Sequence, residues 1–113
     1  MLCVVTLAAG QNPHPLAITH GPVVEGVGNT WAVIAWTTNT GGSTVLRYGT
    51  SPTTLNQTAE APWAKSKSGE HVTHRVHLKD LKPNTTYYFV VDSGQGQGTG
   101  TESRSQVAQF TTK

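Results

Sequence analysis

Three histidines, His71, His74 and His77, recur at intervals of three residues. Imidazole is a common metal ligand, and a zinc site needs three or four ligands converging on one ion. The residues around the histidines alternate as in a β-strand, whose side chains point to opposite faces in turn. Histidines spaced by three would then lie about 10 Å apart along the strand. We therefore predict no metal site, with His71 and His77 facing solvent and His74 facing inward or lying at the start of the strand.

The acidic residues do not indicate a catalytic centre. General acid–base chemistry on glycosidic bonds needs two carboxylates close together, and no two acidic residues are spaced to share one strand face. No serine lies on a nucleophile elbow, and the single cysteine, Cys3, lies outside the expected fold. The sequence predicts no catalytic, cofactor-binding or metal-binding residues, and a protein that is not an enzyme. The acidic residues are Glu25, Glu60, Glu70, Asp80, Asp92 and Glu102.

Glycine recurs at every second position from 94 to 100. A dinucleotide-binding fingerprint needs its glycines between a strand and a helix, and no helical pattern follows this run. A hairpin loop is the simpler interpretation. Because the loops of a β-sandwich often carry recognition, Gly96 and Gly98 are candidates for a binding tip.

Three aromatic residues, Trp31, Trp63 and Tyr88, are expected to point outward. Such side chains can stack on sugars or fill a pocket on a partner protein. Trp31 and Tyr88 are predicted to lie on different sheets, and Trp63 in the polar connection over residues 62–70. With Gly96 and Gly98 they make up the candidate interaction surface. We favour docking against a neighbouring domain over binding of a glycan.

Composition bounds the function further. The chain has 113 residues, which is one domain by length, and only 12% of them are charged. The formal net charge is +2, and the eight basic residues are scattered, so the sequence indicates no nucleic acid partner. One cysteine excludes an intrachain disulfide.

The first ten residues are apolar and end in small residues, like the tail of a secretory signal peptide, although they lack a positively charged start. The run is too short to span a bilayer. We interpret residues 1–13 as a signal-peptide remnant and linker and residues 14–113 as one domain. A disordered or strand-like N-terminus is the alternative. The sequence thus predicts a secreted or periplasmic bacterial protein.

Short segments rich in β-branched and aromatic residues, separated by turn signals, predict an all-β fold of seven strands. The first strand is expected to stop at Gly21-Pro22, with continuation through Val23 and Val24 after a kink as the alternative, and residues 25–29, with their two glycines, are expected to form a turn. Trp36 is predicted to face the core. The expected strands are 16–20, 30–37, 43–48, 55–61, 71–78, 85–92 and 104–112.

The run from Val76 to Val91 reads as strand, corner and strand. Pro83 fixes φ and lacks a backbone donor, while Asn84 tolerates turn geometry. We predict that Tyr87, Phe89 and Val91 point inward and that the Tyr87 hydroxyl reaches back to the main chain of the corner. Leu81 is expected just outside that end of the core.

Residues 81–87 resemble the L-x-P-x-T-x-Y signature of fibronectin type III domains, and Trp36 and the end of the chain extend the resemblance over nearly all of residues 14–113. The segments 31–38, 45–51, 74–78 and 110–112 also resemble the β-sandwich that precedes the catalytic domain in purple acid phosphatases. The resemblance implies a seven-stranded Greek-key β-sandwich of the immunoglobulin-like, fibronectin type III kind. That family's metal ligands belong to its catalytic domain, whose motifs are absent from this sequence.

The sequence therefore predicts a non-catalytic accessory module of an exported protein, packing beside a metallophosphoesterase domain of the purple acid phosphatase type. The alternative is a stand-alone adhesion or carbohydrate-binding module. The expected partner is a neighbouring protein domain, with carbohydrate as the second possibility. No cofactor and no membrane span are expected, and the sequence does not identify the ligand or the oligomeric state.

Overall fold

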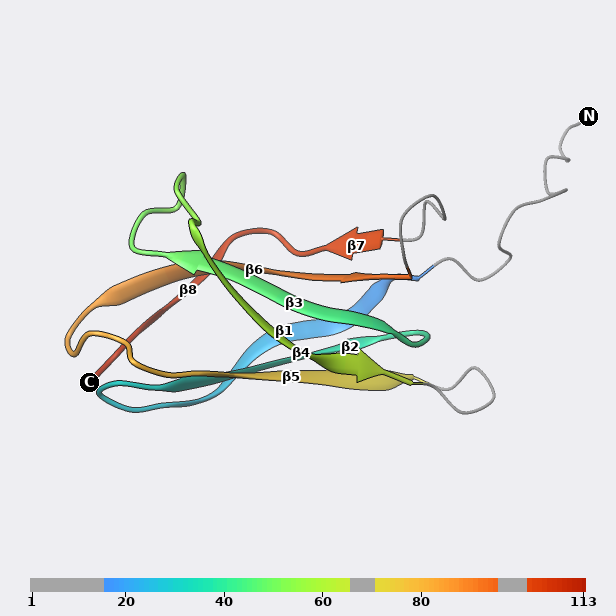
Figure 1. The fold of residues 1–113 in the computed structure, drawn as a ribbon, viewed down its shortest axis with the longest axis horizontal. Helices are drawn as coiled ribbons and strands as arrows, with labels where there is room; N and C mark the ends of the chain where they lie inside the picture. Colours follow the sequence, from blue (N-terminus) through green and yellow to red (C-terminus); the bar gives the residue numbers. More distant parts are fainter. Residues whose placement is uncertain (1–15, 66–70, 96–101) are drawn as a thin grey trace, which may run out of the picture.

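The chain folds into two antiparallel β-sheets that enclose one core (Figure 1). The computed structural model describes residues 16–65, 71–95 and 102–113. The strands are β1 (Ile18–Val27), β2 (Ala32–Thr38), β3 (Gly42–Gly49), β4 (Gln57–Ala64), β5 (Val72–Leu78), β6 (Thr86–Gly94), β7 (Glu102–Arg104) and β8 (Ala108–Thr111). No helix in these ranges is long and apolar enough to cross a bilayer.

The strand order is that of a Greek-key sandwich. One sheet has the order β1-β2-β5, and the five-stranded sheet has the order β4-β3-β6-β7, with β8 also paired to β6. The chain thus changes sheet between β2 and β3, between β4 and β5, and between β5 and β6. The predicted all-β, fibronectin type III-like fold is confirmed.

The seventh expected strand is divided into β7 and β8, which pair with successive parts of β6. Ser105 lies at the interruption. The Val91 amide donates to Ser105 Oγ (3.0 Å), and the Ser105 amide donates to the Val91 carbonyl (2.9 Å). A side-chain oxygen therefore takes the place of a backbone acceptor, and the ladder is interrupted without leaving the Val91 amide unpaired.

The fourth strand ends later than expected. β4 runs to Ala64, so the placement of Trp63 in a connection is wrong. Pro62 does not stop the strand, because β4 is the edge of its sheet and a missing N–H is tolerated there.

The first strand also runs beyond its predicted end. β1 continues past the Gly21-Pro22 kink, with a shift in register between His20 and Val23, and reaches Val27. The turn expected from residue 25 therefore starts later. The two glycines of this segment, Gly26 and Gly28, also make room for the Trp31 ring, since a Cβ at Gly28 would lie 2.1 Å from Trp31 Nε1.

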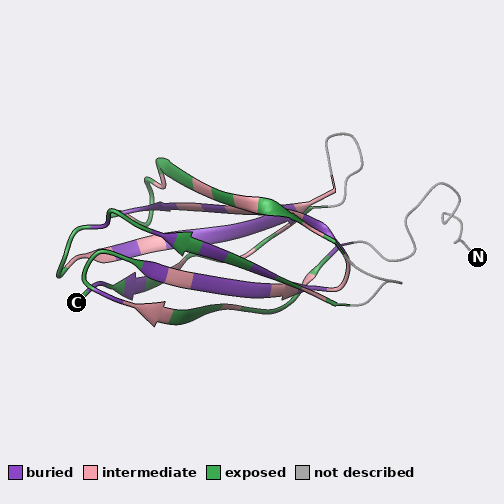
Figure 2. Ribbon diagram, turned by 60° about the horizontal axis from the view of Figure 1, so that its bottom comes forward, coloured by how far each residue is buried: buried purple, intermediate pink, exposed green. Residues whose placement is uncertain are grey.

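The core lies between the sheets, and buried and exposed positions alternate along the strands (Figure 2). The inward orientation predicted for Trp36, Tyr87, Phe89 and Val91 is confirmed, with each at most 4% exposed. Leu81 was expected outside the core but belongs to it, at 5% exposed. The core cluster consists of Ala32, Ile34, Trp36, Leu46, Tyr48, Val76, Leu78, Leu81, Tyr87, Phe89, Val91 and Phe110.

His74 is the centre of a buried polar chain beside the core. Its ring stacks on Trp36, with centroids 5.3 Å apart, and its Nε2 and Nδ1 lie 2.7 Å from the hydroxyls of Thr38 and Thr44. The Thr38 hydroxyl donates to the Thr40 carbonyl (2.7 Å), so it must accept from Nε2–H. Nδ1 is then the acceptor for Thr44. The chain of bonds fixes one neutral tautomer.

The corner after β5 has the predicted geometry. The Lys82 amide donates to the Tyr87 hydroxyl (2.9 Å), and Asn84 has a φ of 51°. Asparagine tolerates this left-handed conformation better than most residues. The far side of the corner is held by Thr112, whose Oγ1 donates to the Lys82 carbonyl and accepts from the Thr85 amide (2.9 Å).

Replacing Tyr87 by phenylalanine should lower the free energy of unfolding by about 1 kcal/mol, the net value of one hydrogen bond. The ring and its packing stay in place, so the loss reports the hydroxyl alone. Urea denaturation measures it. Tyr88→Phe is the matched control on the outer side of the same strand and should change stability by less than about 0.5 kcal/mol. Equal losses in the two variants would contradict the role of the corner.

Burial lowers the pKa of His74 from 6.5 to about 4. Between these values the unfolded chain binds the proton and the folded chain does not, so stability must fall as the pH falls from about 6.5 to 4. The expected loss is roughly 3 kcal/mol, and it is complete below pH 4. Denaturation across this range measures it. His74→Gln should flatten the slope and the exposed-site control His77→Gln should keep it; a parent slope equal to that of His74→Gln would refute the assignment.

Candidate interaction surfaces

Trp31 lies at one end of the sandwich, in the turn that joins β1 to β2. Its ring rests on the backbone of Gly26 and Gly28, and the residue is 44% exposed. The turn is closed by the Gly28 amide, which donates to the Trp31 carbonyl (2.8 Å). Trp31 is thus an exposed aromatic residue on a fixed support.

The last residue of the chain lies at the same end (Figure 1). The Lys113 amide donates to the Gly28 carbonyl (2.9 Å), and the Asn84 amide donates to the Lys113 carbonyl (3.3 Å). The β1–β2 turn, the corner over residues 80–85 and Lys113 form the C-terminal pole. Trp31 and Lys113 therefore lie at the same end of the sandwich.

Trp63 lies near the opposite end of the sandwich, close to the end of β4. It is 49% exposed and borders a hollow of about 310 Å³. We call this the Trp63 hollow. Its other lining residues come from the β2–β3 turn and from the residues that directly follow β4 and β6. They are Thr40, Gly41, Lys65 and Gln95.

Tyr88 lies apart from both tryptophans. It belongs to β6, where it pairs with Gly49 on one side and Gln109 on the other, and it is half-buried. Trp31 was predicted to lie on the other sheet, but it lies in the turn that directly precedes β2. The three aromatic residues therefore do not form one surface. Gly96 and Gly98 lie outside the described residues.

The three histidines are placed as the alternation predicted. His71 and His77 are exposed, and His74 is 1% exposed. Within residues 16–65, 71–95 and 102–113, no three histidine, cysteine or acidic side chains gather closely enough to hold a metal ion.

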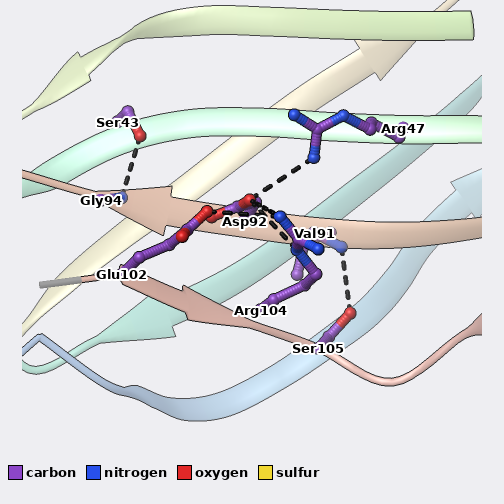
Figure 3. A network of polar contacts seen from close by, with 8 residues as sticks. All are labelled: Ser43, Arg47, Val91, Asp92, Gly94, Glu102, Arg104 and Ser105. Atoms are coloured by element: carbon purple, nitrogen blue, oxygen red, sulfur yellow. Dashed lines mark hydrogen bonds and ion pairs between the residues drawn. The ribbon is translucent and has the colours of Figure 1, made fainter. Parts of the chain in front are cut away.

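An ion network on the paired strands β6 and β7 was not expected (Figure 3). The side chain of Asp92 is only 8% exposed and lies 3.2 Å from Arg104 Nη2 and 3.5 Å from Arg47 Nη1. Glu102 lies 3.4 Å from the same Arg104 nitrogen. A hydrogen bond with Asp92 is the main cause that raises the pKa of Glu102, and Arg104 opposes the shift.

The two carboxylates meet across strands, so the expectation that no acidic pair forms holds only along a single strand. Asp92 pairs with Arg104, and Gly94 pairs with Glu102, in the register of β6 and β7. If residues at equal distances on either side of the glycine-rich segment are paired, Asp92 faces Arg104 and Gly94 faces Glu102. This pairing would have predicted the contact between Asp92 and Glu102 from the sequence. Because two arginines hold Asp92, the network is suited to fixing the hairpin rather than to proton transfer.

Arg104→Ala should destabilise the chain by about 1–3 kcal/mol, because it leaves a buried carboxylate with only the longer contact to Arg47. Thermal or urea denaturation measures the loss. Arg75→Ala is the matched control. It breaks a 2.7 Å pair with Glu25 in which both partners are more than a third exposed, so it should cost less than Arg104→Ala. A smaller loss for Arg104→Ala than for Arg75→Ala would show that the network does not hold the hairpin.

Comparison with known proteins identifies a family for this chain and supports the observed fold. The family model described as "Purple acid Phosphatase, N-terminal domain" matches residues 23–112. No curated protein sequence matches the chain.

Solved structures show the same architecture. The sensor domain of the anti-sigma factor RsgI4 from Pseudobacteroides cellulosolvens is 22% identical, with a TM-score of 0.56 over 88% of this chain and 74% of that one. A second structure of that sensor domain is 25% identical, with a TM-score of 0.55 and 88% of each chain covered. The fibronectin type-III domain of human fibronectin type III domain containing protein 3 is 21% identical, with a TM-score of 0.55 over 90% of this chain and 86% of that one. These similarities establish the fold.

Proposed function

The chain belongs to the family of purple acid phosphatase N-terminal domains, and we propose that it is a non-catalytic accessory module that packs beside a metallophosphoesterase domain. The family description attaches this kind of domain to the N-terminal side of purple acid phosphatases. A module in that position provides a surface for contact with the catalytic domain and takes no part in the reaction. The surface that would contact the catalytic domain can be inferred from the positions of the exposed side chains and of Lys113.

The observation that carries the proposal is the shared position of Trp31 and Lys113. A catalytic domain attached after Lys113 would begin beside the turn that carries Trp31, since the Lys113 amide bonds to that turn. Exposed tryptophans are enriched among the residues that dominate the binding energy of interfaces. Because the ring is already held on Gly26 and Gly28, docking would order it little further. The C-terminal pole is therefore the proposed contact with the catalytic domain.

The state of the carboxylates supports a non-catalytic role. Asp92 is held by Arg47 and Arg104 rather than open to a substrate. His74 is buried with both ring nitrogens bonded to hydroxyls, so it offers no base to solvent. His74 thus stabilises the packing of the core, and Asp92 stabilises the pairing of β6 with β7.

The proposal includes the place and extent of the module. Residues 14–113 form the accessory domain, and residues 1–13 are a signal-peptide remnant and linker. The module acts outside the cytoplasm, secreted or in the periplasm of a bacterium. The apolar run that ends in small residues near Gly10 supports export.

Titration calorimetry of the whole chain with a metallophosphoesterase domain of the purple acid phosphatase type from the same organism tests the docking. We expect binding that Trp31→Ala weakens at least about tenfold, as expected for a central interface residue. Trp63→Ala is the matched control, since it removes an equally exposed tryptophan at the other pole. Absent binding, or equal weakening by the two variants, would refute the contact.

The same purified chain should not hydrolyse p-nitrophenyl phosphate when iron and zinc are supplied. Metal-dependent phosphatase activity that a chelator removes would contradict the accessory role. The outcome is independent of Trp31, so it separates the question of activity from the question of docking.

A second function is favoured by a separate observation. The Trp63 hollow combines an exposed indole with polar groups at the pole opposite Lys113. A stand-alone adhesion or carbohydrate-binding module would use such a site. The two functions place their decisive tryptophans at opposite poles and can be tested one against the other.

A further inference from the structure

The Trp63 hollow is assembled from three segments distant in sequence. Thr40 and Gly41 come from the β2–β3 turn, Trp63 lies near the end of β4 with Lys65 just after it, and Gln95 follows β6. Its volume of about 310 Å³ lies at the lower end of the range of roughly 300–1,000 Å³ that small-molecule sites occupy. The hollow is shallow and open to solvent, so a small ligand or one unit of a polymer would lie against Trp63 rather than be enclosed.

The walls of the hollow are fixed before any ligand arrives. Gln95 Nε2 donates to the Gly41 carbonyl (2.9 Å), and the Gly94 amide donates to Ser43 Oγ (2.9 Å). From the other side the Thr38 hydroxyl donates to the Thr40 carbonyl (2.7 Å). These bonds tie the β2–β3 turn to the end of β6, so a ligand would meet a preformed wall.

The side chains around the hollow differ in chemistry in a way that selects a ligand class. The indole of Trp63 offers an apolar face on which the C–H face of a sugar ring can stack. Thr40 and Gln95 carry hydroxyl and amide groups that suit sugar hydroxyls. Lys65 adds an exposed ammonium group that forms no ion pair with any described residue.

We propose that the Trp63 hollow binds a uronic acid unit of an acidic polysaccharide. The sugar ring stacks on Trp63, and its carboxylate pairs with Lys65. A neutral sugar would use the indole and leave the ammonium group without a partner. Nucleic acid is a poorer match, because one lysine is not the basic stripe that a phosphate backbone needs.

This inference rests on the second function proposed above and gives it a site and a ligand class. It does not depend on docking at the C-terminal pole. Trp31 and Trp63 are 44% and 49% exposed, so each serves as the control for the other. Loss of one function leaves the other to be judged on its own variant.

The test uses the whole chain, labelled with nitrogen-15, and an oligogalacturonate of defined length. Addition of the oligogalacturonate should shift the Trp63 indole N–H resonance and leave that of Trp31, at the C-terminal pole, in place. Trp63→Ala should weaken binding at least about tenfold, which corresponds to about 1.4 kcal/mol. Trp31→Ala should leave the affinity unchanged.

The charge is tested by a second ligand and a second variant. The methyl-esterified oligogalacturonate has the same rings without the carboxylates, and it should bind several-fold more weakly. Lys65→Gln removes an exposed side chain and should reduce affinity for the charged ligand by up to about fivefold, the effect of one exposed ion pair. The same variant should not alter affinity for the ester.

Absence of a shift at the Trp63 indole, or binding that survives both Trp63→Ala and Lys65→Gln, would overturn the proposal. Equal affinity for the charged and esterified ligands would overturn the assignment to acidic sugars. A loss of binding in Trp31→Ala alone would move the site to the other pole and overturn it as well. None of these results bears on association with a metallophosphoesterase domain, which is measured separately with Trp31→Ala.

Discussion

The sandwich depends on one oriented chain of polar contacts that crosses its interior. From Thr44 on β3 the hydrogen bonds pass through His74 on β5 to Thr38 on β2 and end at the Thr40 carbonyl. Apolar surfaces alone allow two sheets to slide with little penalty, because burial is not directional. A buried imidazole has partners in only one register, and any other would leave polar groups unpaired at a cost of about 1–3 kcal/mol each. The chain therefore selects how the two sheets face each other.

That constraint extends to the surface. Trp36 stacks on His74, and its Nε1 donates to Ser93 (2.9 Å), the residue before Gly94 at the end of β6. The same end of the sandwich holds Thr40, where the polar chain terminates, and Gln95, which bonds to Gly41. The walls of the Trp63 hollow are thus continuous with the buried network. A protonated imidazole would donate from both nitrogens, so the Thr44 hydroxyl would have to turn and accept a hydrogen bond. The arrangement of bonds that ends at Thr40, in the wall of the hollow, therefore requires a neutral His74.

Features encoded by local pattern could be predicted from the sequence. Alternation identified the inward residues of β6, and the spacing of Pro83, Asn84 and Tyr87 identified the corner, because all three act within a few residues of one another. Features that require pairing across strands could not be predicted in this way. Asp92 and Glu102 are ten residues apart in sequence but meet through the β6–β7 register, and the Ser105 bond divides a strand that propensity alone would make continuous. Gly28 suggested a turn for a correct local reason, yet the ring it accommodates lies three residues away.

The same limit explains what the sequence revealed of the candidate sites. Trp31 and Trp63 could be identified as candidates by residue type, but residue type alone did not predict which groups surround each of them. Trp31 stands on glycine backbone beside Lys113, whereas Trp63 borders a hollow with an ammonium group, because the Greek-key order brings different loops to the two ends. The two faces of the sandwich are set by strand alternation, while the ends are built from turns whose residues are not restricted in this way. Two indoles of nearly equal exposure are therefore suited to different partners, because the fold brings different turns together at the two ends of the sandwich.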